Sequence, residues 1–173
     1  WPPIRHLFGI RPVEAGVGTC TFLTPASPWL QSVHGAYTGG VYALAADAAL
    51  GGAVATGIEP WHAVATSQLC MNFLRPAGPW SGRLTARGRL IHTTPTVGLS
   101  EVHIEDAEGR LLAHGTSRCF LQRIEPQRDV EPEPDHASMP AYDTPDPYLR
   151  PVKGAMFPPS FFEGHSGLEL LRM

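Results

Sequence analysis

Apolar and polar residues alternate near the start of the chain, and a long segment of small residues follows. From Val13 to Pro25 the alternation is typical of a half-buried strand. One face of this strand would carry Val17, Thr19, Thr21 and Leu23. The next segment, from about Gly39 to Thr56, is bounded by glycines and rich in alanine. Its length and composition predict a buried helix.

Four long segments after this helix have the composition of strands, and turn signals rich in proline and glycine separate them. They are His62–Pro76, Ser81–Thr94, Val97–Gly109 and Arg110–Ile124. One strand, one central helix and a meander of four strands predict an α+β fold, in which a curved antiparallel sheet wraps around the helix.

The end of the chain has a different composition. Nine of the 18 prolines follow Glu125, and such a density sustains neither a helix nor a central strand. We therefore expect a folded domain over residues 1–125, a proline-rich linker or surface-wrapping tail over 126–160, and a short C-terminal helix over 161–173.

Charge and hydropathy argue against two classes of partner. The net charge is -3 and no basic run exceeds two residues, so we expect no binding to nucleic acid. The longest weakly polar stretch, Val41–Gly57, contains Asp47. It falls short of the roughly 20 apolar residues that span a membrane, so we expect a soluble protein without membrane contact.

Cysteine and histidine spacing gives no sign of a metal site. Cys20, Cys70 and Cys119 are far apart and form no CxxC pair. We predict that all three are buried free thiols on strands, which indicates a reducing, cytoplasmic setting. The histidines show neither HxxxH nor HxH spacing, so we expect no metal.

The predicted helix carries the candidate chemistry. Asp47 stands among alanines, and a carboxylate in such company is costly to bury unless it is paired or used. Gly39 and Gly40 would lie at the helix N-terminus, where free N–H groups and the helix dipole favour a developing negative charge. The alternative for Asp47 is a solvated or hydrogen-bonded helix residue, and the alternative for Gly39 and Gly40 is a plain helix entry without chemistry.

Several stretches in order resemble the hotdog-fold acyl-CoA thioesterases of the phenylacetate-pathway type. These stretches are "TGGVYALAADAALGGAV", "TSQLCMNFLRPA", "SGRLTARGRLIH" and "EDAEGRLLAHGTSRCFL", and the resemblance covers about Pro3 to Ile124. It implies a hotdog fold, a dimer of two hotdog units and an acyl-CoA substrate, with no cofactor besides the coenzyme A of the substrate.

The family pattern at the helix entry is Asn-Pro-x-Gly-x-x-His-Gly-Gly, with an acidic residue nine positions after the histidine. Asp47 matches this acid, which implies that it is the catalytic carboxylate. Thr38 stands in place of the histidine and Ser32 in place of the asparagine, while His34 lies four positions before Thr38. Thr66 falls where some members place a Ser or Thr that holds the attacking water or nucleophile.

The spacing along the helix predicts a shared site. Gly39 and Asp47 are eight residues apart, which is roughly 12 Å along a helix. One carbonyl group cannot contact both, since each contact spans about 3 Å. Two hotdog units packed around a two-fold axis would bring the glycines of one copy to the aspartate of the other, so we expect a homo-oligomer with at least a hotdog dimer.

We therefore predict a cytoplasmic acyl-CoA thioesterase. The predicted catalytic residues are Asp47 as base or nucleophile, Gly39 and Gly40 as oxyanion donors, and Thr66 as the group that orients water. The predicted substrate-binding residues are Thr38, Ser32, His34 and Arg75, and the candidate walls of the acyl cleft are Trp61, Tyr37, Tyr42, Phe73 and Trp80.

Two alternatives remain open on the sequence. Because the expected histidine and asparagine are replaced, the domain could be a non-catalytic hotdog that binds an acyl thioester or has only a structural role. In addition, "SGLELLRM" at the end resembles the lead-in to the "PPI" entry of such a domain. This favours either a tandem protein with a second hotdog after Met173 or a tail helix that packs on its own or a neighbouring copy.

Overall fold

The computed structural model describes residues 4–5, 8–60 and 62–124. The chain divides into two units, and one of them, Ile10–Pro126, contains all the named helices and strands. The predicted proline-rich segment over 126–160 and the predicted helix over 161–173 lie outside the described residues, as does Trp61.

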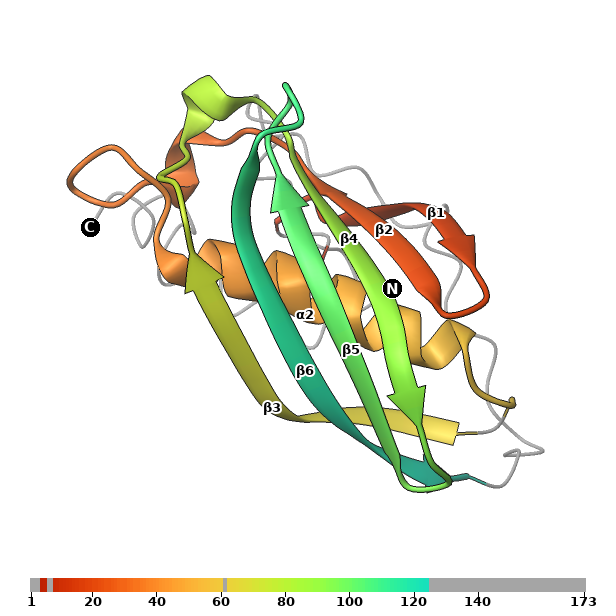
Figure 1. The fold of residues 1–173 in the computed structure, drawn as a ribbon. Helices are drawn as coiled ribbons and strands as arrows, with labels where there is room; N and C mark the ends of the chain where they lie inside the picture. The colour runs from red at the N-terminus through yellow and green to blue at the C-terminus, as the bar shows by residue number, and fades with distance from the viewer. Residues whose placement is uncertain (1–3, 6–7, 61, 125–173) are drawn as a thin grey trace, which may run out of the picture. The chain divides into compact units, whose positions relative to one another are not determined.

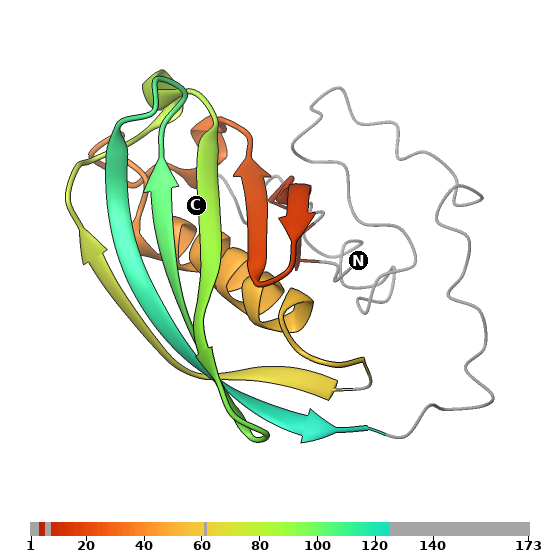
Figure 2. The same ribbon diagram turned by 45° about the vertical axis from the view of Figure 1, so that its right-hand side comes forward.

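The unit Ile10–Pro126 is one long helix packed on a six-stranded antiparallel sheet (Figure 1). Helix α2 spans Gly39–Thr56, as the sequence predicts. The strands are β1 (Arg11–Gly16), β2 (Thr19–Thr24), β3 (His62–Phe73), β4 (Leu84–Thr93), β5 (Val97–Glu105) and β6 (Leu111–Arg123), and two short 3-10 helices, η1 (Pro28–Leu30) and η2 (Pro79–Ser81), lie in the connections. The sheet curves around α2 (Figure 2), which confirms the predicted α+β hotdog architecture.

The first predicted strand is two strands, and its assignment was wrong. A two-residue turn at Val17 and Gly18 reverses the chain, and Gly18 adopts a φ of 71°, which favours glycine. Val17 is 91% exposed at this turn. On β2, Cys20 and Phe22 pack towards α2, so Thr19, Thr21 and Leu23 share the other face, as the alternation predicts.

The predicted meander of four strands is also only partly correct. The sheet order is β1-β2-β4-β5-β6-β3, so β4, β5 and β6 form a meander while β3 pairs with β6. The segment from Leu74 to Arg83 runs past the end of the sheet from β3 to β4 (Figure 1). Strand β3 therefore lies at a sheet edge, which the order of elements along the chain does not reveal.

Small residues let α2 approach the sheet closely. The most buried helix positions are Ala45, Ala46, Ala49, Leu50, Ala53 and Val54. Opposite them, Gly88 on β4 lies so near that a Cβ there would be 2.2 Å from the Ala49 carbonyl oxygen. The alanine-rich composition that predicts the helix thus also sets its depth in the curve of the sheet.

The prediction for the cysteines is correct for two of the three. Cys20 and Cys119 are buried free thiols on strands, whereas Cys70 on β3 is exposed. A β-bulge at Ser67 explains the difference, because Thr66 pairs with Cys119 but Gln68 already pairs with Arg118. The extra residue shifts the alternation and turns Cys70 to the outer face.

Candidate functional site

Asp47 and Thr66 come together between α2 and the edge strand. The Thr66 hydroxyl donates a hydrogen bond to Asp47 Oδ1 at 2.8 Å. Thr66 is exposed, and Asp47 is only partly covered. The Asp47 carboxylate is therefore fixed by one hydroxyl while it remains open to a substrate or to water.

The bulge at Ser67 places residues on both sides of it on the face that packs on the helix. Ser67 Oγ donates to the Arg118 carbonyl oxygen at 3.0 Å, which holds the extra residue against β6. Before the bulge Thr66 pairs with buried Cys119, and in the shifted register after it Leu69 pairs with buried Ser117. Both Thr66 and Leu69 thus face α2, although they are three residues apart, an odd spacing that a regular strand would place on opposite faces.

The two glycines lie at the open N-terminus of α2. Thr38 is the N-cap with extended backbone (φ -72°, ψ 156°), and its side chain makes no capping hydrogen bond. Gly39 and Gly40 occupy the first two helical positions and are exposed. Their amides have no intrahelical acceptor because they precede the first helical carbonyls. This helix end can donate hydrogen bonds to an oxyanion.

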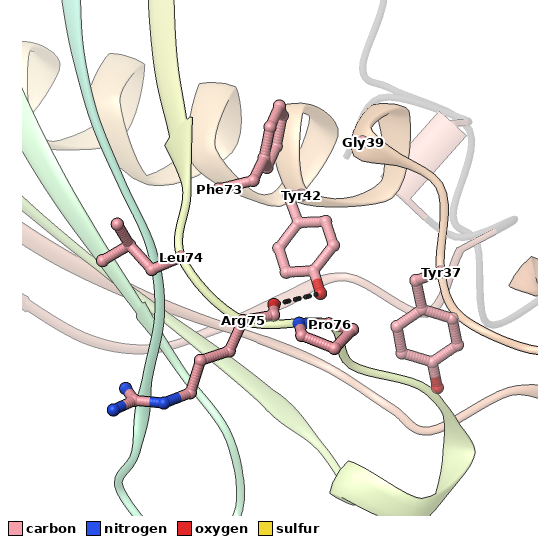
Figure 3. A pocket seen from close by; sticks show the side chains of 7 residues that line it. All are labelled: Tyr37, Gly39, Tyr42, Phe73, Leu74, Arg75 and Pro76. Carbon is pink, nitrogen blue, oxygen red and sulfur yellow. Dashed lines mark hydrogen bonds between the residues drawn. The ribbon is translucent and has the colours of Figure 1, made fainter.

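A pocket of about 360 Å³ opens beside this helix end (Figure 3). Its lining residues are Tyr37, Gly39, Tyr42, Phe73, Leu74, Arg75 and Pro76. Phe73 packs edge to face on Tyr42 at a centroid distance of 5.6 Å, and a Cβ on Gly39 would lie 3.0 Å from the Phe73 ring. Because Gly39 has no side chain, the Phe73 ring can lie close to the N-terminus of α2.

Polar groups of the pocket come from Tyr42 and Arg75. The Tyr42 hydroxyl donates to the Arg75 carbonyl oxygen at 3.2 Å (Figure 3). Burial raises the pKa of Tyr42 above its ordinary value, so the phenol stays a neutral donor. The Arg75 guanidinium donates to the Leu111 carbonyl oxygen at 2.7 Å, and its exposed side chain points away from Tyr42.

Ser32 and His34 belong to a turn in the loop before α2. The Ser32 amide donates to the Ala36 carbonyl at 2.7 Å, and the Gly35 amide donates to the Ser32 carbonyl at 2.9 Å. The Ser32 hydroxyl accepts from the His34 amide at 3.3 Å. The Ser32 side chain is thus held by a local turn bond, and neither Ser32 nor His34 lines the pocket beside Gly39.

The structure brings the predicted residues together in two places rather than one. Asp47 meets Thr66, and Gly39 shares a pocket with Arg75. The predicted aromatic walls Tyr37, Tyr42 and Phe73 line that pocket, whereas Trp80 does not and is 62% exposed. Leu74 and Pro76 also line the pocket although they were not predicted to do so, and their position on either side of Arg75 was the available signal.

In the part of the chain that the structure describes, no three His, Cys, Asp or Glu side chains are grouped closely enough to hold a metal ion. Among those same residues, no helix combines the length and apolar character needed to cross a membrane.

Comparisons with known proteins agree with the fold. Residues 34–113 match the Thioesterase superfamily. The structure of a thioesterase from Haemophilus influenzae is similar with a TM-score of 0.66 and 20% identity, covering 73% of this chain and 87% of that chain. AziG from S. sahachiroi is similar with a TM-score of 0.65 and 26% identity, covering 72% of this chain and 98% of that chain. The E. coli PaaI protein from the phenylacetic acid degradation operon is similar with a TM-score of 0.63 and 21% identity, covering 70% of this chain and 84% of that chain.

A comparison with curated protein sequences gives no significant match. The match over residues 34–113 and the six-stranded sheet around one helix show that the chain has the hotdog fold and is similar to the Thioesterase superfamily. The predicted resemblance to hotdog thioesterases is thereby confirmed, and the fold is shared with the PaaI protein from the phenylacetic acid degradation operon. Together these findings support thioester hydrolysis as the general chemistry of the chain.

Proposed function

We propose that the protein hydrolyses acyl-CoA or a closely related acyl thioester, with Asp47 as the reacting carboxylate. The observation that carries this proposal is the 2.8 Å hydrogen bond from Thr66 to Asp47 Oδ1. This bond occupies one carboxylate oxygen, so Oδ2 is left for a water molecule or for the thioester carbonyl carbon. A positioned carboxylate with an open face is what a general base or a nucleophile requires.

The chemistry balances with these groups alone. Asp47 takes a proton from water as the water oxygen bonds to the carbonyl carbon, or its own oxygen attacks that carbon. The tetrahedral oxyanion is stabilised by amide donors at the N-terminus of α2, Gly39 and Gly40. The carbon–sulfur bond then breaks. On the base route the thiolate leaves with the proton that Asp47 took from water. On the nucleophile route it leaves as the thiolate, and water then hydrolyses the anhydride between Asp47 and the acyl group, which releases the acid, restores the carboxylate and supplies the proton to the thiolate.

The oxyanion donors come from a second copy of the chain. Gly39 and Asp47 lie on one uninterrupted helix, and eight residues of helix separate them by about 12 Å. A homodimer built around a two-fold axis places the helix end of each copy near the carboxylate of the other. On this proposal Arg75 and the pocket beside Gly39 bind the coenzyme A part of the substrate.

Replacing Asp47 tests the proposal directly. Asp47→Asn keeps the shape of the side chain and an oxygen that can accept from Thr66, but it removes the base and nucleophile. We expect kcat for an acyl-CoA panel, followed by thiol release, to fall by about 100-fold or more, with an unchanged melting temperature. Glu14→Gln, at an exposed position on β1, is the matched control and should leave kcat unchanged.

Two outcomes would contradict this assignment. Full activity of Asp47→Asn would show that the carboxylate is not the reacting group. Saturable binding of acyl-CoA by the unaltered protein without release of thiol at any chain length would favour a non-catalytic binding domain instead.

The amide of Gly39 can be removed without breaking the helix. Proline suits the first helical position, and the extended backbone of Thr38 is what a following proline requires. Gly39→Pro therefore deletes one N–H, while Gly39→Ala keeps it and adds the same Cβ beside Phe73. We expect Gly39→Pro to lower kcat by about 100-fold or more, with a much smaller loss for Gly39→Ala.

Mixing two inactive variants tests whether the site is shared. If donor and carboxylate come from different copies, Gly39→Pro and Asp47→Asn chains form heterodimers with one intact site. Random exchange makes half of the dimers heterodimers, so activity should recover to about a quarter of the unaltered level. No recovery after verified subunit exchange would place both groups in one chain and refute the shared site.

A further inference from the structure

A buried thiol lies directly behind the proposed catalytic pair. Cys119 on β6 is opposite Thr66 in the register of β3 and β6, and it is completely buried. On one side it packs with Val54 and Leu121 in an apolar cluster. On the other side its Sγ lies 3.9 Å from Thr66 Oγ1.

A second hydroxyl continues this contact into the core. Ser117, two residues before Cys119 on the same strand face, is 1% exposed. Its Oγ lies 3.5 Å from Cys119 Sγ. Four side chains thus form one chain of polar contacts, from buried Ser117 through Cys119 and Thr66 to the carboxylate of Asp47 at the surface.

Each hydroxyl or thiol in this series has one hydrogen to donate, and this fixes the direction of the hydrogen bonds. Ser, Thr and Cys each have a single donor hydrogen, and Thr66 uses its hydrogen on Asp47. Thr66 Oγ1 can then only accept from the Cys119 thiol. The Cys119 sulfur in turn accepts from Ser117, so every hydrogen points towards Asp47.

We propose that Cys119 is a positioning residue, whose thiol holds the Thr66 hydroxyl in the orientation that donates to Asp47. This inference rests on the proposed function of Asp47. Linked donors polarise one another, so each bond in the chain strengthens the next. A thiol suits this place because it packs like a small apolar side chain and still has a weak donor. Thr66 is exposed, and without Cys119 its hydroxyl would rotate more freely towards solvent.

The test compares variants with and without a donor at position 119. Cys119→Ala and Cys119→Val remove the donor, and valine preserves most of the volume if alanine impairs folding. We expect both to lower kcat by about 2- to 10-fold, the range for one neutral hydrogen bond, with KM within about twofold because no substrate contact is lost. Cys119→Ser restores a donor and should recover kcat to within about twofold of the unaltered protein.

Cys20→Ala is the matched control for loss of a buried thiol. Cys20 lies on β2 and packs against α2 at Gly52, where a Cβ would be 2.9 Å from its sulfur. Its replacement should lower the melting temperature as a core deletion does, with kcat unchanged. If kcat fell only because the protein is less stable, the Cys20 and Cys119 variants would lose kcat alike, and this result would contradict a positioning role for Cys119.

A double-mutant cycle shows whether Cys119 acts through Thr66. In a Thr66→Val background, Cys119→Ala should cause no further loss of kcat, because the hydroxyl that it orients is gone. Additive losses in the cycle, or unchanged kcat in both donor-free Cys119 variants, would overturn the inference. If Asp47→Asn abolishes activity in the same experiment, that result leaves the proposed function standing, whereas an active Asp47→Asn protein removes both.

Discussion

The hydroxyl of Thr66 should contribute a measurable part of catalysis. Thr66→Val replaces the hydroxyl with a methyl group of the same shape, and a β-branched side chain suits the strand. The substitution removes the 2.8 Å bond to Asp47. A hydrogen bond to a charged group contributes about 1.5–3 kcal/mol. Because Thr66 is exposed and water can partly replace it, we expect the lower value.

A loss of about 1.5 kcal/mol in transition-state stabilisation corresponds to roughly a tenfold lower kcat. Steady-state thiol release from an acyl-CoA measures this, and Thr66→Ser, which keeps the hydroxyl, should remain close to the unaltered protein. Thr116→Val is the control, because Thr116 on β6 alternates with buried Gly115 and Ser117 and so faces the outer side of the sheet. Unchanged kcat in Thr66→Val would refute the orienting role, and a loss as large as that of Asp47→Asn would assign Thr66 a more direct part.

Three further predictions concern stability, pH and substrate recognition. Gly51→Ala should raise the free energy of unfolding by up to about 1 kcal/mol, since a Cβ there meets nothing within 4 Å in the chain and alanine favours the helix. Gly52→Ala should lower it, because its Cβ would lie 2.9 Å from the Cys20 sulfur; equal effects in denaturant titrations would contradict the described packing. Burial would raise the pKa of Asp106, but bonds from the Arg110 amide and guanidinium and the Glu108 amide outweigh it and lower that pKa. The stabilisation by Asp106 is therefore complete above its ordinary pKa of 3.8 and is lost as the pH falls through the lower folded value, so Asp106→Asn should flatten the acid side of the stability profile, and an unchanged slope would refute this. Arg75→Gln should raise KM about fivefold for an acyl-CoA, as expected for loss of one exposed charged contact to phosphate, but not for the same acyl group on N-acetylcysteamine, which has no phosphates; an equal rise for both would remove the phosphate contact.

Local sequence determined the central helix and the residues on it. Glycines bound the helix at both ends, and alanines fill its interior, so its limits of Gly39 and Thr56 follow from neighbouring residues alone. The same local information places Asp47 two turns after the glycine pair. The distance between the two groups, and with it the expectation of a second copy, depends only on the rise of a helix.

Strand pairing and register were decided by the tertiary structure. The composition of β3 indicates a strand, but only the fold places it at the edge beside β6 rather than beside β4. The bulge at Ser67 then reverses the alternation that the sequence suggests, exposing Cys70 and keeping Thr66 opposite Cys119. Register depends on contacts between residues 40 or more positions apart, which no local pattern records.

Asp47 illustrates both contributions. The sequence alone identified it as a carboxylate that needs a partner, because a charge among alanines is costly to bury. Only the folded chain determined that this partner is Thr66, with Cys119 and Ser117 behind it. The physical reason is that helix formation depends on neighbouring residues, whereas the contacts of an edge strand depend on how the whole sheet closes around the helix.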